Sequence, residues 1–193
     1  MKHTNTKAIV GTGILTALVL ILQLWIAQSI KIGTFSITLV LVPIVVGAAL
    51  YGWKSGVWLG FVFGLATLAD AAPFFAISYF GTIATCLTKG VLAGLAAALV
   101  YKAFEKKNRY VAVFLAGLVC PIVNTGIFVL GTYIFFFDAM KEASIANNYA
   151  SATEYIFLGM IGGNFLIEVA INLILNPAIL RILNVVKKQP AKA

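Results

Sequence analysis

Long apolar stretches alternate along the chain with short polar ones, and this alternation predicts the secondary structure. Lys, Arg, Asp and Glu are absent from long stretches at residues 8–30, 32–53, 55–69, 71–88, 110–137 and 155–167. A helix that crosses a membrane needs about 20 mostly apolar residues. A segment in lipid must satisfy its own backbone hydrogen bonds, which favours helices. The pattern therefore predicts helices near residues 8–29, 35–52, 55–71, 79–101, 110–137 and 154–182.

The composition places these helices in a membrane. Hydrophobic residues make up 62% of the 193 residues and charged residues 10%, and the mean hydropathy is +1.02. Soluble domains have about 45–50% apolar and about 25% charged residues. So few charges cannot cover a surface that faces water, so the surface must face lipid. We therefore expect an all-α integral membrane protein, in which residues 1–193 form one domain of six transmembrane helices.

The distribution of charge predicts the orientation of the bundle. Short cytoplasmic loops collect Lys and Arg. With six spans, one side of the membrane holds eleven of the fourteen basic residues: Lys2, Lys7, Lys54, Lys102, Lys106, Lys107, Arg109, Arg181, Lys187, Lys188 and Lys192. The other side holds four of the six acids: Asp70, Asp138, Glu142 and Glu154. We therefore expect both termini in the cytoplasm and a multi-pass protein of the cell membrane.

Several classes of function are not indicated. The net charge of +8 does not predict nucleic-acid binding, because the basic residues are spread over loops and tails beside apolar spans. No Walker A, H-E-x-x-H, G-x-S-x-G or paired-carboxylate pattern occurs. We therefore expect neither an enzyme nor a bound metal or cofactor. Cys86 and Cys120 lie within predicted helices and are interpreted as packing residues rather than as a disulfide or metal pair.

Polar residues inside the predicted spans point to a binding site. Lys89, Asn124 and Glu168 lie near the middle of the fourth, fifth and sixth predicted helices. Ionisable residues within a span are costly and usually functional. We expect a substrate pocket between these three helices, in which Lys89 holds an anionic group. The alternative is a structural ion pair between Lys89 and Glu168, with asparagines bridging the helices.

A polar stripe on the sixth predicted helix extends this candidate pocket. Asn164, Glu168, Asn172 and Asn176 recur every four residues, which places neighbouring members on one helical face. We expect Asn124, Asn164, Asn172 and Glu168 to bind hydroxyl or amide groups of a ligand.

Aromatic residues near the outer side are candidate walls and lids. Tyr79 and Phe80 are expected to line the pocket, and Phe74 and Phe75, beside Pro73, are expected to act as a lid. Trp25 and Tyr133 fit equally well an aromatic belt at the membrane interface. The outer loops at 70–78 and 138–153 are read either as lids or as plain connectors.

Small residues four apart mark surfaces where helices approach closely. The pairs are Gly13 with Ala17, Gly60 with Gly64, and Gly90 with Gly94. Internal packing is the simplest interpretation. The first helix has few other polar features, so its small face could instead contact another membrane subunit.

Two stretches of the chain have a familiar pattern: KIGTFSITLVLVPIVVGAALYGWKSG at residues 31–56 and GFVFG at residues 60–64. In these stretches the chain resembles the substrate-binding S component of energy-coupling factor (ECF) vitamin transporters. Six spans, basic ends inside and a small-residue motif in the first helix agree with this resemblance. It implies that the protein captures a small water-soluble vitamin outside and delivers it with a membrane T subunit and two cytoplasmic ATPases. It also implies that Gly13 and Ala17 contact the T subunit, with Gly in place of the usual first Ala.

Within that family the chain looks most like pantothenate-type components. Pantothenate carries a carboxylate, hydroxyls and an amide, which suit Lys89 and the polar residues around it. Hydroxymethylpyrimidine, riboflavin, folate or another small vitamin could be the ligand instead. The chain could also be a stand-alone secondary carrier or channel, although no convincing inverted repeat occurs. An enzyme acting on lipid would need a nucleophile, a metal or a pair of carboxylates within the membrane, and Glu168 is the one carboxylate expected there.

Overall fold

The computed structural model describes residues 2–26, 31–32, 35–36 and 39–188. Helices account for most of this part, and two short strands precede the second long helical segment. The elements are α1 (Lys2–Ile21), the π-helical η1 (Leu22–Ile26), β1 (Lys31–Ile32), β2 (Phe35–Ser36), α3 (Leu41–Tyr51), α4 (Trp53–Thr67), the 3-10 turn η2 (Leu68–Asp70), α5 (Ala72–Phe75), α6 (Tyr79–Phe104), α7 (Arg109–Phe135), α8 (Phe137–Ala146), α9 (Ala152–Glu154), the π-helical η3 (Tyr155–Ile161) and α10 (Gly162–Lys188).

Four of the described helical segments are long and apolar enough to cross a membrane: Thr6–Trp25, Tyr79–Phe104, Arg109–Phe135 and Ala152–Val186. The chain is therefore an all-α membrane protein. The 11 residues of α3 extend only about 17 Å, which is less than the hydrocarbon thickness of about 30 Å. That all six predicted segments cross the membrane stays a prediction.

The second helical segment begins later than the sequence pattern suggested. A helix was expected from residue 35, but Phe35–Ser36 pairs with Lys31–Ile32 as an antiparallel two-stranded sheet, and α3 begins at Leu41. Residues 34–39 read TFSITL, in which polar and apolar residues alternate with the period of a strand. Pro43 then falls in the first turn of α3, where its missing N–H costs no helical hydrogen bond.

Other boundaries also differ from those expected. The span expected at 110–137 ends as α7 at Phe135, and α8 forms in a loop for which no helix was expected. The span expected at 154–182 starts two residues earlier, contains the π-helical η3 and continues to Lys188. The end expected for the first helix, at residues 27–29, lies outside the described residues.

Polar caps define where the two central helices begin. The Ser78 Oγ accepts a hydrogen bond from the Gly81 N–H at 3.1 Å and starts α6. The Asn108 Oδ1 accepts from the N–H groups of Tyr110 at 2.9 Å and Val111 at 3.3 Å and starts α7. Such N-caps satisfy donors that have no partner within the helix.

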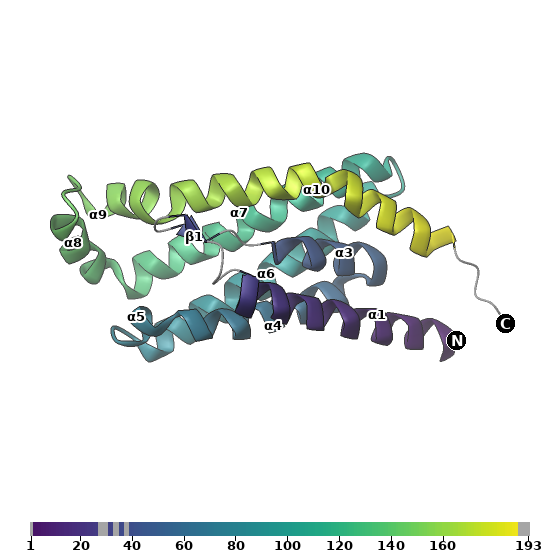
Figure 1. The fold of residues 1–193 in the computed structure, drawn as a ribbon, viewed down its shortest axis with the longest axis horizontal. Coiled ribbons are helices and arrows are strands. Elements are labelled where there is room, and N and C mark those ends of the chain that lie inside the picture. Colours follow the sequence, from purple (N-terminus) through teal and green to yellow (C-terminus); the bar gives the residue numbers. More distant parts are fainter. Residues whose placement is uncertain (1, 27–30, 33–34, 37–38, 189–193) are drawn as a thin grey trace.

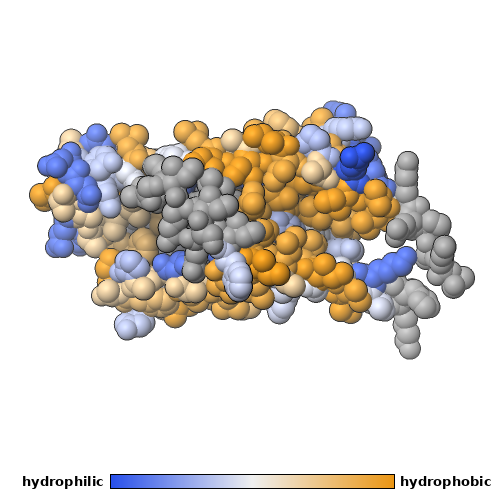
Figure 2. Space-filling view, viewed as in Figure 1, coloured by the Kyte–Doolittle hydropathy of each residue, from blue (hydrophilic) through white to orange (hydrophobic). Residues whose placement is uncertain are grey.

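The helices form an elongated bundle with two distinct ends (Figure 1). We call the end at which α1 begins, α10 ends and the α6–α7 turn lies the terminal end. The opposite end, which carries α5, α8 and α9, we call the loop end. Hydrophobic side chains cover much of the surface between the two ends, and hydrophilic ones gather at the ends (Figure 2). This distribution fits a protein whose middle lies in lipid.

Glycine residues let α4 and α6 approach each other closely. A Cβ atom added at Gly60 would collide with the backbone carbonyl of Gly90, and one added at Gly56 would collide with that of Gly94. The two helices therefore touch backbone to backbone. The internal packing role predicted for Gly60, Gly90 and Gly94 is confirmed by these contacts.

Candidate functional site

The polar stripe of α10 faces the interior of the bundle. Glu168, Asn172 and Asn176 are buried, and Asn164 is half-buried. Asn172 is fully inaccessible at 0% exposure, and its Nδ2 donates to the Glu168 carbonyl at 2.9 Å. Asn124 is buried on α7, the helix beside α10. The structure thus brings polar groups of two helices into one apolar bundle.

Several buried polar atoms in this region make no hydrogen bond within the described part of the chain. They are the Oδ1 atoms of Asn124, Asn172 and Asn176, the Nδ2 of Asn176, the Oγ1 of Thr85 and the Oε1 of Gln23. Leaving a buried polar atom unsatisfied costs about 1–3 kcal/mol. A polar ligand or water that supplies the missing partner would recover this free energy. These atoms are therefore the best candidates for ligand contacts.

Thr85 and Gln23 were not predicted as site residues. Thr85 precedes Lys89 by four residues on α6, so both lie on one face of that helix. Gln23 lies at the end of the first helix and donates through Nε2 to the Asp70 Oδ2 at 3.2 Å. The signals were available in the sequence, as a hydroxyl one turn from the lysine and a glutamine in an apolar span.

Lys89 sits between two aromatic rings. Its Nζ lies 5.6 Å from the ring centroid of Phe63 on α4 and 5.3 Å from that of Phe128 on α7. Ring faces attract a cation. Residues 2–26 and 39–188 contain one ion pair between described side chains, Lys141 with Asp138 at 3.0 Å at the loop end. The direct ion pair of Lys89 with Glu168, which was the structural alternative, is therefore not present.

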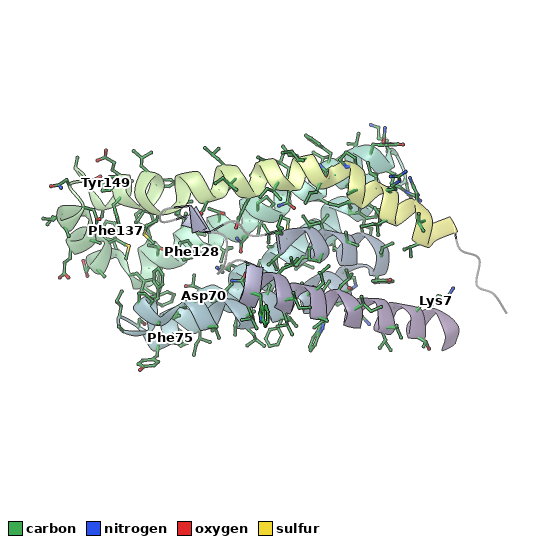
Figure 3. All side chains as sticks on the ribbon, in the orientation of Figure 1. Lys7, Asp70, Phe75, Phe128, Phe137 and Tyr149 are labelled. Atoms are coloured by element: carbon green, nitrogen blue, oxygen red, sulfur yellow. The ribbon has the colours of Figure 1, made fainter. Side chains whose placement is uncertain are left out.

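Phe128 lies between Lys89 and the loop end, on the same face of α7 as Asn124. Asn124 and Phe128 are four residues apart on α7 and share one face. Phe74 of α5 packs edge-on against Phe128, with ring centroids 5.9 Å apart, and against Phe136 at 5.1 Å. Phe128 lies closer to the middle of the bundle along its length than Phe137 or Tyr149 (Figure 3). Phe74 therefore closes over the ring on which Lys89 rests.

The other predicted aromatic residues lie elsewhere. Tyr79 and Phe80 are each 74% exposed and therefore do not line the polar interior. Phe80 also projects from the side of α6 opposite Thr85 and Lys89. Phe75 packs against Tyr79 at 5.5 Å between ring centroids. Of the two expected lid residues, only Phe74 contacts a ring that also contacts Lys89.

The segment after α7 is a packed cover. Phe136, Met140, Ala152, Ile156 and Ile161 form a buried apolar cluster at the loop end, separate from the main core. The Tyr133 hydroxyl donates to the Thr153 Oγ1 at 3.0 Å and ties α7 to α9. This loop therefore packs on a small apolar cluster, and its role as a lid stays a prediction.

The small pair on α1 faces outward. Gly13 and Ala17 are both exposed, and a Cβ added at Gly13 would meet nothing within 4 Å. The neighbouring side of α1 is fixed to α4, because Thr12 and Ser55 share a hydrogen bond of 2.9 Å and the Trp58 Nε1 donates to Thr16 at 3.1 Å. Gly13 and Ala17 therefore lie on a side of α1 that points away from the bundle, beside larger exposed residues such as Ile14 and Ile21.

The two cysteines and the potential metal ligands suggest no further site. Cys86 and Cys120 are both buried and form no disulfide. Within the described ranges no group of three or more His, Cys, Asp or Glu residues could hold a metal ion.

Comparison with known proteins adds independent information. A family model described as "ECF transporter, substrate-specific component" matches residues 7–180. A relative from Lactococcus lactis subsp. cremoris (strain MG1363), named "Pantothenic acid transporter PanT", is 25% identical over 197 residues, which cover 93% of this chain and 94% of the relative. No solved structure matches significantly.

Proposed function

The chain belongs to the family of substrate-specific components of ECF transporters, and we propose that it captures pantothenate outside the cell and delivers it through a complex with a T subunit and two ATPases. As a member of this family it serves vitamin uptake and is not an enzyme. The name of the Lactococcus relative supports pantothenate as the ligand. The partners follow from how ECF substrate-specific components work.

One observation carries the choice of ligand. The Lys89 Nζ is held by the rings of Phe63 and Phe128, and no described carboxylate forms an ion pair with it. An anionic group can therefore bind this cation without displacing a partner. A charge-assisted hydrogen bond of this kind is among the strong ones in proteins.

The rest of the polar interior suits the remainder of pantothenate. Its hydroxyls and amide N–H can donate to the Oδ1 atoms of Asn124 and Asn172, which accept no other hydrogen bond from described residues. Glu168 and Asn164 complete the proposed site on α10. Phe74 closes it at the loop end by packing on Phe128. The site then excludes water from a small, flexible, mostly aliphatic ligand.

Purification of the chain alone tests the ligand. We expect pantothenate to be found by mass spectrometry after the folded protein is denatured, and radiolabelled pantothenate to bind one to one without ATP. Unlabelled hydroxymethylpyrimidine, riboflavin and folate should not displace it. Displacement by one of these would identify another vitamin as the ligand. Ion-driven uptake by the chain alone in liposomes would instead show a secondary carrier.

We also propose that six segments cross the membrane with both termini in the cytoplasm. In support, α1 begins and α10 ends at the same end of the bundle (Figure 1), and Lys7 lies there (Figure 3). The α6–α7 turn, with Lys106 and Lys107, lies at this end as well. A basic terminal end fits the positive-inside rule.

The outward face of α1 is the proposed contact with the T subunit. We expect the double variant Gly13→Leu, Ala17→Leu to bind pantothenate within about twofold of wild type, because α1 keeps its hydrogen bonds to α4. Its assembly should fall by more than about tenfold, because two leucines prevent the close approach that small residues allow. Co-purification with the co-expressed T subunit and ATPases measures this.

Gly126→Leu is a matched control for the α1 variant. A Cβ at Gly126 also meets nothing within 4 Å, but this residue lies on α7. We expect Gly126→Leu to assemble normally. Normal assembly of the α1 double variant would show that the T subunit docks elsewhere.

A further inference from the structure

An apolar groove runs along the surface between α7 and α10 near the terminal end. Its volume is about 400 Å³, and it is lined by Tyr110, Val111, Phe114, Leu173, Asn176, Pro177 and Leu180. Tyr110, Val111 and Phe114 are exposed, so the groove opens to the outside of the bundle. It lies away from Lys89 and Phe74 of the proposed vitamin site.

A guanidinium lies next in the chain to the groove residue Tyr110. The Arg109 Nη1 donates to the Asn184 Oδ1 at 2.9 Å, and these two residues adjoin the lining residues Tyr110 and Leu180. Asn184 follows Leu180 by four residues and lies on the same face of α10. A guanidinium has five N–H donors, so Arg109 keeps donors for a further acceptor.

The charge around this end of the groove is strongly positive. The described basic residues of the α6–α7 turn and the adjoining part of α10 are Lys102, Lys106, Lys107, Arg109 and Arg181, and the acid among them is Glu105. At the terminal end of the bundle, on the right of Figure 2, hydrophilic side chains lie directly beside hydrophobic surface. An apolar groove below a cationic rim is complementary to an amphiphile with an anionic head.

The dimensions agree with a lipid chain. Leu173 and Leu180 are seven residues apart, so the groove follows α10 for about 10 Å. This is roughly two thirds of the depth of one leaflet, given a hydrocarbon core of about 30 Å for two leaflets. Basic pockets between membrane helices are known to bind anionic head groups.

We propose that this groove is a binding site for one anionic phospholipid. The phosphate lies at Arg109, Lys107 and Arg181, and one acyl chain lies along Phe114, Leu173 and Leu180. The bound lipid bridges α7 and α10, the two helices that also carry Asn124 and the polar stripe.

Native mass spectrometry of the purified full chain tests this proposal. The protein is equilibrated in detergent with equal amounts of palmitoyl-oleoyl phosphatidylglycerol and phosphatidylcholine, which share their acyl chains. We expect one phosphatidylglycerol to be retained at least about fivefold more than phosphatidylcholine, because each cationic residue near the head group contributes about fivefold. Equal retention of the two lipids by the wild type would overturn the proposal.

Two variants separate the rim from the groove. Lys107→Gln with Arg181→Gln removes two charges without touching the Arg109–Asn184 bond, and we expect retention of phosphatidylglycerol to fall about five- to twentyfold. Val111→Trp fills the groove and should reduce retention of phosphatidylglycerol to the level of phosphatidylcholine. Thermal unfolding shows that each variant is folded.

Matched controls complete the test. Lys7→Gln with Lys54→Gln removes two charges on α1 and α4, and Leu130→Trp adds an indole to an exposed position of α7 outside the groove. Both should retain phosphatidylglycerol as the wild type does. If the groove and rim variants also retain phosphatidylglycerol as the wild type does, the lipid does not bind at this groove and the proposal fails. If they lose the co-expressed T subunit but keep the lipid, the groove is a protein-docking surface and the proposal fails.

Discussion

Replacement of Lys89 by alanine is expected to weaken pantothenate binding by about tenfold to more than a hundredfold. The change removes a cation that faces the interior of the bundle between Phe63 and Phe128. A hydrogen bond to a charged group is worth about 1.5–3 kcal/mol, and each 1.4 kcal/mol is a tenfold change in affinity. Equilibrium binding of radiolabelled pantothenate to the purified variant measures the loss.

A neutral analogue distinguishes a ligand contact from a structural role. In pantothenyl alcohol a CH₂OH group replaces the carboxylate, so its binding should depend much less on Lys89. We expect Lys89→Ala to weaken pantothenate binding strongly and to change binding of the alcohol by only about threefold or less. The difference between the two ligands isolates the pairwise contribution, as in a double-mutant cycle. Equal losses for both ligands would show that Lys89 acts by shaping the site.

Lys141 provides a matched control for Lys89. Its Nζ also lies over an aromatic ring, 4.9 Å from the centroid of Phe137, but it is exposed at the loop end and paired with Asp138. Exposed ion pairs contribute about 0–1 kcal/mol. Lys141→Ala should therefore leave both pantothenate affinity and the unfolding midpoint almost unchanged. If Lys141→Ala weakens binding as much as Lys89→Ala does, the carboxylate binds at the loop end.

Replacement of Gly60 by leucine is expected to prevent folding. A Cβ at this position collides with the Gly90 carbonyl, and the next atoms met are also backbone atoms. Backbone cannot move aside as a flexible side chain does, so α4 and α6 must separate. This separation opens the interface that holds Phe63 beside Lys89. We expect little or no monodisperse protein in size-exclusion chromatography.

Smaller substitutions keep this prediction measurable. Gly60→Ala introduces the Cβ alone, and overpacking of this kind typically costs about 1–3 kcal/mol. Gly126→Ala, at an open position of α7, should be neutral or stabilising by about 0.5–1 kcal/mol because alanine favours a helix. Thermal unfolding in detergent compares the two. A Gly60→Ala protein as stable as Gly126→Ala would show that α4 and α6 do not meet at this glycine.

The sequence by itself identified the class of protein and the residues with unusual chemistry. Charge-free apolar stretches predict membrane helices because lipid solvates neither charges nor unpaired backbone groups. Lys89, Asn124 and Glu168 were predicted as site residues because polar groups within apolar spans are costly and usually functional. The period of the helix placed Asn172 with Glu168 on one face. These inferences depend on composition and spacing along one helix, which the sequence contains in full.

The tertiary structure decided which residues meet across helices. Nothing in the spacing along α6 could show that Lys89 rests on Phe63 and Phe128 instead of pairing with Glu168. The sequence also placed Phe80 in the site, but its side of α6 faces outward. Helical periodicity gives the direction of a side chain relative to its own helix, whereas its partner depends on how neighbouring helices are rotated and shifted. Here the glycines of α4 and α6 set that arrangement, because their backbone contact fixes how close the two helices lie.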